Sequence, residues 1–245
     1  MRLPGGQELL DLWERVADRP CSFRALALLS AAHPESSWQE LAQLSIGERD
    51  QRLLKLRAHL FGATPEMLSR CPACGEKVES VLPIRALCEQ SSPPTLAVEN
   101  ILDVDGYRVC FRLLAAGDLL AIERCSPGQA RAKLLRRCIR WATNPDARSV
   151  SARDLPAPVV SAVTAAMEAA DTAAYLEVGL TCVACGHSWH TVLDVAHYLW
   201  REIGSWAKRT LLDVHRIARA YGWTEAETLA LSPTRRQIYL ELIAA

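Results

Sequence analysis

The sequence has no excess of charge of either sign. Lysine and arginine together number 28, and aspartate and glutamate also number 28. A protein that grips nucleic acid through its phosphates usually carries a basic excess, and this chain has none. The charge balance therefore argues against nucleic acid as the main partner.

Long apolar runs are missing as well. No stretch approaches the 18 uninterrupted apolar residues that indicate a membrane-spanning helix. The segment MRLPGGQELLDLWERV turns polar after Pro4-Gly5-Gly6, without the apolar region that precedes the cleavage site of a secretory signal. We therefore expect a cytoplasmic protein without membrane insertion.

Motifs of several common enzyme classes are also absent. The sequence contains no G-x-S-x-G nucleophile motif, no glycine-rich phosphate loop and no dinucleotide-binding fingerprint. Scattered acids and histidines on predicted helices are typical of solvated surfaces. We therefore expect no enzyme activity and no small-molecule substrate.

Cysteine is plentiful, but its number is odd. With nine cysteines and no secretion signal, metal ligands and buried thiols are expected rather than a disulfide framework. Four of them belong to two Cys-x-x-Cys-Gly motifs, CPACG at 71–75 and CVACG at 182–186. The other five are expected to be small, buried apolar side chains: Cys21, Cys88, Cys110, Cys125 and Cys138.

Each Cys-x-x-Cys-Gly motif is followed by a strand-like segment, KVESVLPI or HSWHTVLDV. Two residues between paired cysteines allow one tight turn to present both sulfurs, and the glycine supplies positive φ. Four thiolates complete the closed tetrahedral shell that Zn²⁺ favours. The motifs therefore predict one structural Zn²⁺ site in a zinc ribbon, with the ligands Cys71, Cys74, Cys182 and Cys185.

The two halves of this ribbon are unusually far apart. Cys74 and Cys182 are separated by 107 residues, whereas roughly 15 to 20 separate the halves of an ordinary ribbon. The ribbon is therefore split, and its metal would hold together two β segments that are distant in sequence.

Other interpretations of the cysteines remain open. A redox-active Cys-x-x-Cys normally precedes a helix in a βαβ unit, whereas both motifs here precede strands. A catalytic zinc needs an open coordination position, which four cysteines would fill. His187 would be the substitute if one cysteine did not bind the metal, and otherwise His187 and His190 are expected on the solvent-facing surface of the hairpin.

A zinc-ribbon adaptor that binds nucleic acid is the alternative function. Such a protein needs basic and aromatic side chains around the cysteine turns. The flanking segments CGEKVES and CGHSWH together contain one lysine and two glutamates. Salt-sensitive binding to DNA or RNA would distinguish this alternative.

Hydrophobic periodicity predicts helices near both ends of the chain, with β structure between them. A capping box of Ser45 and Glu48 opens one helix, which Gly62 ends, and Thr64-Pro65 predicts a further short helical turn before Cys71. A hairpin is predicted around Asp105-Gly106. Residues 116–143 and 157–169 are predicted to be helical, and AAYLEVGLT predicts the strand before Cys182.

The C-terminal third predicts one long helix from about Asp194 to Ala220. Two short helices follow, the first opened by a capping box of Thr224 and Glu227 and the second by Ser232-Pro233. These two helices are expected either to pack as a hairpin on the long helix or to dock a partner. The apolar stripe of the long helix consists of Trp200, Ile203, Ala207, Leu211, Val214, Ala218 and Tyr221.

These patterns predict a mainly helical α+β protein, with a small β module that contains the split zinc ribbon and a long C-terminal helix. The expected segments are an N-terminal helical region (1–69), the first ribbon half with the hairpin (70–115), middle helices (116–172), the second ribbon half (173–193), and the long helix with its helical hairpin (194–245).

The tail DVHRIARAYGWTEAETLALSPTRRQIYLELI, at 213–243, resembles the C-terminal signature of the baseplate hub assembly chaperone, or baseplate protein, family of phage contractile tails and contractile injection systems. The segments SFRALALLSAA and GERDQRLLKLR and both cysteine motifs resemble the N-terminal region and split ribbon of the same family. The resemblance therefore extends over nearly the whole chain.

This resemblance implies a non-enzymatic role in building a baseplate, either as a chaperone or as a retained component. The implied partners are baseplate or hub proteins, in the cytoplasm of a bacterium or an infected bacterial host. The matching tail supplies the candidate partner-binding residues Tyr221, Gly222, Trp223, Arg235, Arg236 and Tyr239.

Overall fold

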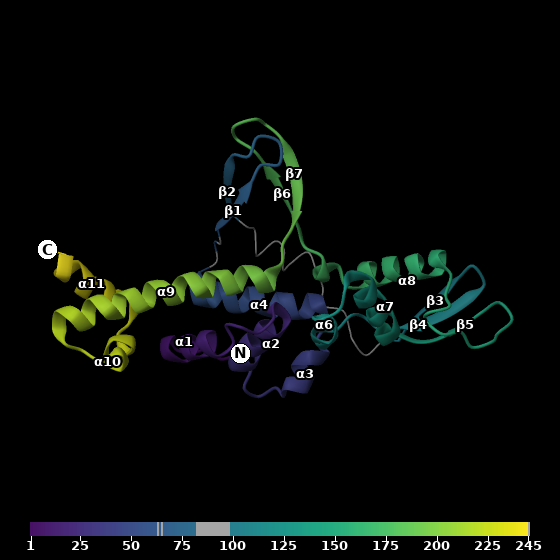
Figure 1. Cartoon of the computed structure of the whole chain (residues 1–245), viewed down its shortest axis with the longest axis horizontal. Coiled ribbons are helices and arrows are strands. Elements are labelled where there is room, and N and C mark those ends of the chain that lie inside the picture. The colour runs from purple at the N-terminus through teal and green to yellow at the C-terminus, as the bar shows by residue number, and fades with distance from the viewer. Residues whose placement is uncertain (63, 65, 82–98, 245) are drawn as a thin grey trace.

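The structure is a computed structural model that describes residues 1–62, 64, 66–81 and 99–244. It is mainly helical, with small antiparallel sheets and one long helix, so the predicted α+β class is confirmed. Figure 1 shows an elongated helical body, a lobe at one end of it and two β-hairpins that project from its side.

The helical body combines the N-terminal helices with the long helix of the C-terminal third. Its members are α1 (Gly6–Arg15), α2 (Cys21–Ala32), α3 (Trp38–Gln43), α4 (Ile46–Phe61) and α9 (Val195–Tyr221).

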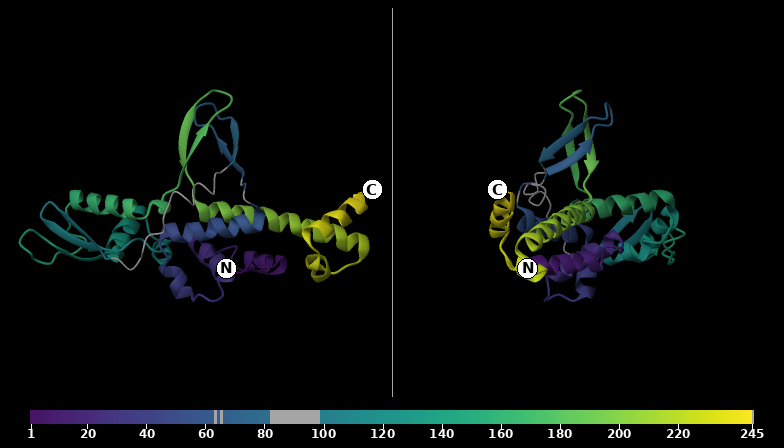
Figure 2. Two further views of the ribbon diagram at one scale, coloured as in Figure 1. Left: turned by 180° about the vertical axis from the view of Figure 1, so that it is seen from behind. Right: turned by 60° about the vertical axis from the view of Figure 1, so that its left-hand side comes forward.

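The main core lies where α2 and α4 pack against α9. The left view of Figure 2 shows α4, in blue, running alongside α9, in yellow-green. The sequence of α2, CSFRALALLSAA, is apolar on most of its faces because other helices pack on it from several sides. The core side chains Leu26, Leu53, Leu199 and Ile203 are completely buried.

The long helix α9 begins and ends close to the predicted residues. The side chain of Asp194 caps its first turn by accepting a hydrogen bond from the N–H of His197 (2.9 Å), and Gly222 ends it at a φ of 71°. No helix in the described part of the chain combines the length and apolarity needed to cross a membrane.

The buried stripe of α9 differs from the predicted one. Leu211 and Tyr221 are each 40% exposed, whereas Thr210 and Ile217 are buried. The buried seam runs through Ile203, Ala207, Thr210, Val214 and Ile217, a straight line of residues three or four apart. The predicted stripe was wrong at these positions: it followed apolar residues only and so passed over Thr210, and it continued through Tyr221 instead of Ile217.

Two short helices follow α9 and pack on it, as one of the two interpretations predicted. They are α10 (Glu225–Ala230) and α11 (Pro233–Ala244). The capping box of Thr224 and Glu227 is present, with both hydrogen bonds made, and the hydroxyl of Ser232 accepts a hydrogen bond from the N–H of Arg235 (3.3 Å).

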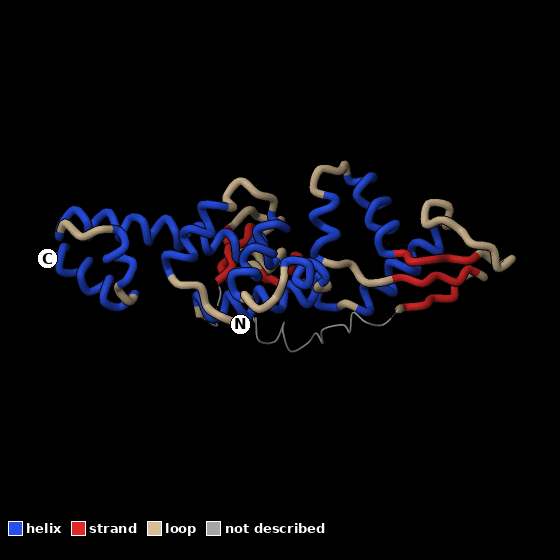
Figure 3. The backbone as a smooth tube through the Cα atoms, turned by 90° about the horizontal axis from the view of Figure 1, so that it is seen from below, coloured by secondary structure: helices blue, strands red, loops and turns tan. Residues whose placement is uncertain are grey.

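The lobe at the other end of the body has its own sheet and core. Its strands β3 (Asn100–Val104), β4 (Tyr107–Phe111) and β5 (Ile139–Thr143) form an antiparallel sheet in that order, which Figure 3 shows edge to edge at the end away from the C-terminus. Asp105 and Gly106 form the predicted turn, both at positive φ. The helix α8 (Ala157–Ala170) covers the sheet and buries Val109, Phe111, Val159 and Val163.

The prediction of continuous helix over 116–143 was wrong in its last part. The chain forms α6 (Ala116–Ile122), α7 (Pro127–Cys138) and then β5. β5 pairs with β4 and buries Ala142 opposite Val109, while Trp141, opposite Cys110, stays 41% exposed. Sheet pairing therefore outweighs the helical pattern that continues from α7.

The predicted helical turn after Thr64 was also wrong. Glu66–Arg70 forms the strand β1, which pairs with β2 (Lys77–Val81) in register from Glu66 opposite Val81 to Arg70 opposite Lys77. Glutamate, methionine and leucine favour helix, but the turn at Cys71 folds this segment back on β2 and fixes it as a strand.

A close contact joins α4 to the segment after α8. The second residue of α4, Gly47, donates its backbone N–H to the buried carboxylate of Asp171 (3.0 Å). Asp171 precedes the short 3₁₀ helix η1 (Thr172–Ala174), which packs on α4. The carboxylate therefore caps α4 from 124 residues away, where the helix dipole favours negative charge.

A second buried carboxylate joins α6 to the lobe. Asp118 is 1% exposed and accepts hydrogen bonds from both terminal nitrogens of Arg112 (2.6 and 2.8 Å), from Nε of Arg137 (2.6 Å) and from the N–H of Ala115 (2.9 Å). Burial raises the pKa of Asp118, but these donors outweigh it and hold that pKa below its ordinary value.

Replacing Asp118 with asparagine is expected to lower the free energy of unfolding at pH 7 by about 3 kcal/mol, because two arginines lose their charged partner. Since folding lowers the pKa of Asp118, its contribution is present above the unfolded pKa of about 3.9 and is lost as the pH falls through the lower folded value. Denaturant unfolding from pH 7 to acid would check this. An equal loss in Asp103→Asn, whose ion pair with Arg108 is exposed, would contradict it.

Candidate metal centre

The two Cys-x-x-Cys-Gly motifs form matching turns at the tips of two β-hairpins. One hairpin is β1 and β2, and the other is β6 (Glu177–Thr181) and β7 (Ser188–Val192), the strands predicted on either side of the second motif. In Figure 1 both hairpins project together from the body, with their turns at the far end.

The backbone hydrogen bonds of the two turns are the same. In the first turn, the N–H of Cys71 donates to the carbonyl of Glu76 (2.8 Å), and the N–H of Gly75 donates to the carbonyl of Cys71 (2.9 Å). The N–H groups of Cys182 and Gly186 make the equivalent bonds in the second turn (2.9 Å each). Gly75 and Gly186 lie at φ of 76° and 73°, as the motif predicted. Each turn therefore presents its two cysteines in the same way.

The turns bring all four predicted cysteines together across 107 intervening residues. The sulfurs of Cys71, Cys74, Cys182 and Cys185 lie within 4.8 Å of one another. Across the two hairpins, the sulfurs of Cys71 and Cys185 are 3.7 Å apart, and so are those of Cys74 and Cys182. These separations are far longer than the bond of about 2.05 Å in a disulfide.

The sulfur separations fit a tetrahedral metal ion. A Zn²⁺ ion bonded to sulfurs at about 2.3 Å holds them about 3.8 Å apart, and the two measured pairs are at 3.7 Å. Soft thiolates are also the donors that Zn²⁺ accepts in closed structural sites. The residues present therefore fit a structural zinc ion.

The acidity of the thiols shows why a cation suits this cluster. Burial raises the pKa of Cys71, but backbone N–H groups and the neighbouring thiols outweigh it and lower that pKa to about 7. A backbone hydrogen bond lowers the pKa of Cys74, but the other three thiols raise it to about 12. One thiol loses its proton readily, and the negative charge that results opposes deprotonation of the neighbouring thiols. A positive ion at the centre offsets this repulsion and favours all four as thiolates.

Burial of the cluster is uneven. Cys71 and Cys182 are buried in a small core with Val78 and the half-buried Trp189, whereas Cys74 and Cys185 are exposed. His187 stacks on Trp189, with ring centroids 6.1 Å apart. Among the described residues, the only group of three or more potential ligands is formed by the four cysteines, so His187 is not part of it.

Comparison with known proteins gives one family. Residues 33–200 match the family described as T4 bacteriophage base plate protein. The chain belongs to this family. The matched range begins before α3, includes both cysteine turns and ends in the first part of α9, so the family relationship covers the complete cysteine cluster. Searches of curated proteins and of solved structures gave no match.

The tail that carries the C-terminal resemblance lies outside the residues matched to this family. Tyr221, Trp223 and Tyr239 form an aromatic cluster, with ring centroids 4.8 to 5.6 Å apart. Arg235 and Gly222 are exposed, and Gly222 ends α9. Arg236 is buried and donates to the carbonyl of Leu231 (3.5 Å).

Sequence reasoning offered a docking surface in this tail as one interpretation, but it did not identify the two most exposed apolar side chains of α11. Ile238 is 51% exposed and Leu242, four residues later, is 62% exposed, so both lie on one outer face. Their spacing was available in the sequence. The orientation of α11 on α9, which decides that this face points outward, was not.

The cysteines outside the motifs follow the prediction in part. Cys110 and Cys138 are buried, and burial raises the pKa of Cys138 to about 11, which suits an unreactive thiol. Cys21 and Cys125 are only half-buried. Cys88 lies outside the described residues.

Proposed function

We propose that this chain is a non-enzymatic assembly protein of a contractile-tail baseplate, which binds other baseplate or hub proteins in a bacterium or infected host cell. The observation that carries the proposal is the family match over 33–200, the range in which both cysteine turns lie. A role as a chaperone or as a retained component fits this proposal equally.

We further propose that Cys71, Cys74, Cys182 and Cys185 hold one structural Zn²⁺. When bound, the ion supplies four strong bonds to sulfur and no open position for substrate. The chain itself supplies the two rigid turns and the small core beneath them. The ribbon is then a scaffold that fixes the two hairpins relative to each other.

The contact surface that we propose for baseplate partners is the end of the molecule formed by α10 and α11. The aromatic cluster of Tyr221, Trp223 and Tyr239 fixes α11 against the end of α9. This support leaves Ile238 and Leu242 facing outward, with Arg235 exposed on the same helix. Apolar anchors with a polar rim are typical of protein interfaces.

A capture experiment with the proteins encoded by neighbouring genes tests this function. The full chain is expected to capture a tail or baseplate protein, and a chain ending at Ala220 is expected to lose it while keeping about one zinc per chain. Because truncation also removes packing on α9, the double variant Ile238→Glu, Leu242→Glu is the sharper test and should reduce capture at least about tenfold.

The matched control is Ile101→Glu, the same kind of change at an apolar side chain that is 47% exposed on β3, in the lobe at the other end of the body. It should leave capture unchanged. Capture of no tail protein by the full chain, together with salt-sensitive binding to DNA or RNA, would replace the proposal with the adaptor function.

A further inference from the structure

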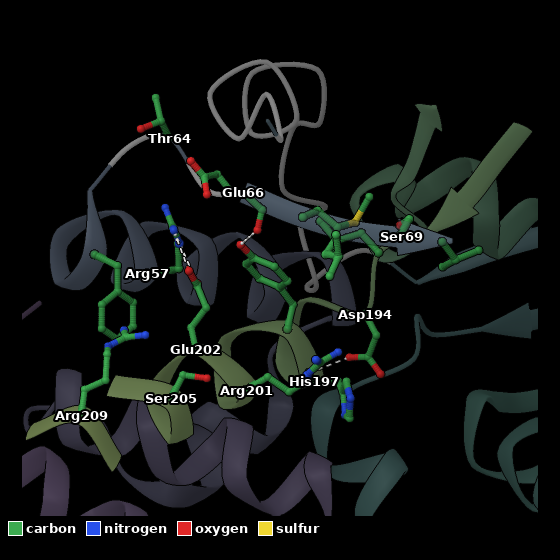
Figure 4. A pocket seen from close by; sticks show the side chains of 16 residues that line it. Arg57, Thr64, Glu66, Ser69, Asp194, His197, Arg201, Glu202, Ser205 and Arg209 are labelled. Carbon is green, nitrogen blue, oxygen red and sulfur yellow. Dashed lines mark hydrogen bonds and ion pairs between the residues drawn. The ribbon is translucent and has the colours of Figure 1, made fainter. Parts of the chain in front are cut away.

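A cleft lies where the first hairpin meets the long helix, and neither the four cysteines nor any residue of α11 lines it. Its volume is about 680 Å³. β1 and the end of β7 form one wall, and α9 forms the other, with Arg57 of α4 at one end. Figure 4 shows Arg201, Ser205 and Arg209 along the α9 wall and Ser69 on the strand side.

The strand wall is an open sheet edge. The N–H of Cys71 donates to the carbonyl of Glu76, the residue before β2. Residue pairs along an antiparallel ladder alternate between hydrogen-bonded and non-hydrogen-bonded. The backbone groups of Glu66, Leu68 and Arg70 therefore point away from β2. A hydrogen bond supports this direction for Glu66: its carbonyl accepts from the hydroxyl of Tyr198 on α9 (2.9 Å).

The free edge of β1 offers backbone N–H and C=O groups to which a further strand can pair. Within the described residues, β1 pairs with β2 alone. Leu68 lies in the middle of the outward-pointing positions, and its side chain is 59% exposed in the cleft. On the same wall, Val192 of β7 is 50% exposed, so the strand side of the cleft offers two apolar side chains to an added segment. Exposed strand edges of this kind bind extended peptides by main-chain hydrogen bonds.

The helix wall carries cations that have no acidic partner. Arg201 and Arg209 are exposed, eight residues apart on the same face of α9, with Ser205 midway between them. Neither arginine makes an ion pair with any residue in the described part of the chain. His197, one turn before Arg201, continues the same row.

Two of the three carboxylates that line the cleft already accept hydrogen bonds from other residues. Glu202 accepts hydrogen bonds from Nε and Nη2 of Arg57 (2.8 and 2.7 Å). Asp194 caps the first turn of α9. Glu66 is the remaining carboxylate, and in Figure 4 its side chain points toward Thr64, away from Arg201 and Arg209. Arg201 and Arg209 therefore stand on the α9 wall as cations without an ion-pair partner among the described residues, available to an incoming carboxylate.

We propose that this cleft binds an extended, acidic segment of a partner protein. The segment adds to the free edge of β1 through the backbone of Leu68, and its carboxylates pair with Arg201 and Arg209. The proposal rests on the proposed function only for the source of the segment, an assembling partner. No residue of α11 and no cysteine lines the cleft, and Arg201 lies outside the pocket that Arg209 shares with α11.

The test uses the full chain and a short fluorescein-labelled peptide of alternating glutamate and valine, with binding followed by fluorescence anisotropy at near-physiological salt. We expect this peptide to bind, and we expect a lysine–valine peptide to bind at least about tenfold more weakly. N-methylation of alternate amides of the acidic peptide should weaken its binding by about as much, because methylation blocks strand pairing.

Charge reversal locates the site. Arg201→Glu and Arg209→Glu should each weaken binding of the acidic peptide about tenfold. Lys208→Glu is the matched control, because Lys208 is exposed on the same turn of α9 but does not line the cleft, and it should leave the affinity within about twofold.

The inference is overturned if the methylated peptide binds as tightly as the unmethylated one. It is also overturned if both arginine variants bind the unmethylated acidic peptide as tightly as the wild type does. Tighter binding of a short single-stranded DNA at the same arginines would overturn it as well. If the full chain binds the acidic peptide but captures no tail or baseplate protein, the result counts against the proposed function alone.

Discussion

Replacing Cys74 or Cys182 with serine is expected to leave a chain that is insoluble or partly melted and that no longer holds zinc. Each substitution removes one of four thiolates whose sulfurs face one another across the two hairpins. Structural zinc in small fingers contributes about 10 to 16 kcal/mol of apparent binding free energy at neutral pH. By analogy with a disulfide, closing a loop of about 100 residues would add about 4.7 kcal/mol by restricting the unfolded chain.

Metal content and thermal unfolding, measured on the same samples, check this expectation. Cys125→Ser is the control, because Cys125 is half-buried and lies outside the cluster, so its zinc content should stay at one per chain. Unchanged unfolding temperature and unchanged zinc content in Cys74→Ser would refute the metal site.

Replacing Gly47 with alanine is expected to cost about 3 kcal/mol of unfolding free energy. An added Cβ would lie 2.0 Å from Oδ1 of Asp171 and 2.7 Å from the Cβ of Ala173. Neither neighbour is the end of a long, flexible side chain, so η1 has to move away from α4. The same movement weakens the hydrogen bond from Gly47 to the buried Asp171.

Gly128→Ala is the matched control for this prediction. Gly128 is also the second residue of its helix, α7, and an added Cβ there meets nothing within 4 Å. Alanine should therefore stabilise this site by about 0.5 kcal/mol, since glycine is the poorer helix former. Denaturant unfolding of both variants gives the comparison, and a loss of similar size in both would show that the contact with Asp171 is not the cause.

Local chemistry made parts of the fold predictable from the sequence. The capping residues at Thr224 and Ser232, the turn at Asp105-Gly106 and the two cysteine turns all depend on neighbours within a few residues. The cysteine cluster was predictable for a further reason: two identical motifs need each other to complete a four-sulfur shell, however far apart they lie.

Contacts over long distances decided the parts that the sequence did not predict. Residues 66–70 and 139–143 have mixed propensities and become strands because β2 and β4 pair with them. The capping of α4 by Asp171 and the burial of Arg236 likewise depend on segments brought together by the whole fold. Single-residue patterns contain no information about these partners.

The separation of the two cysteine turns has a consequence for synthesis on the ribosome. Cys71 and Cys74 leave the ribosome well before their partners, and at about 5 to 20 residues per second the 114 positions between Cys71 and Cys185 take about 6 to 23 seconds to translate. During that interval the first turn can offer a metal only two sulfurs. The polypeptide of the lobe between the turns therefore emerges before the second pair of thiols, and the four-sulfur cluster can form only late in the maturation of each chain.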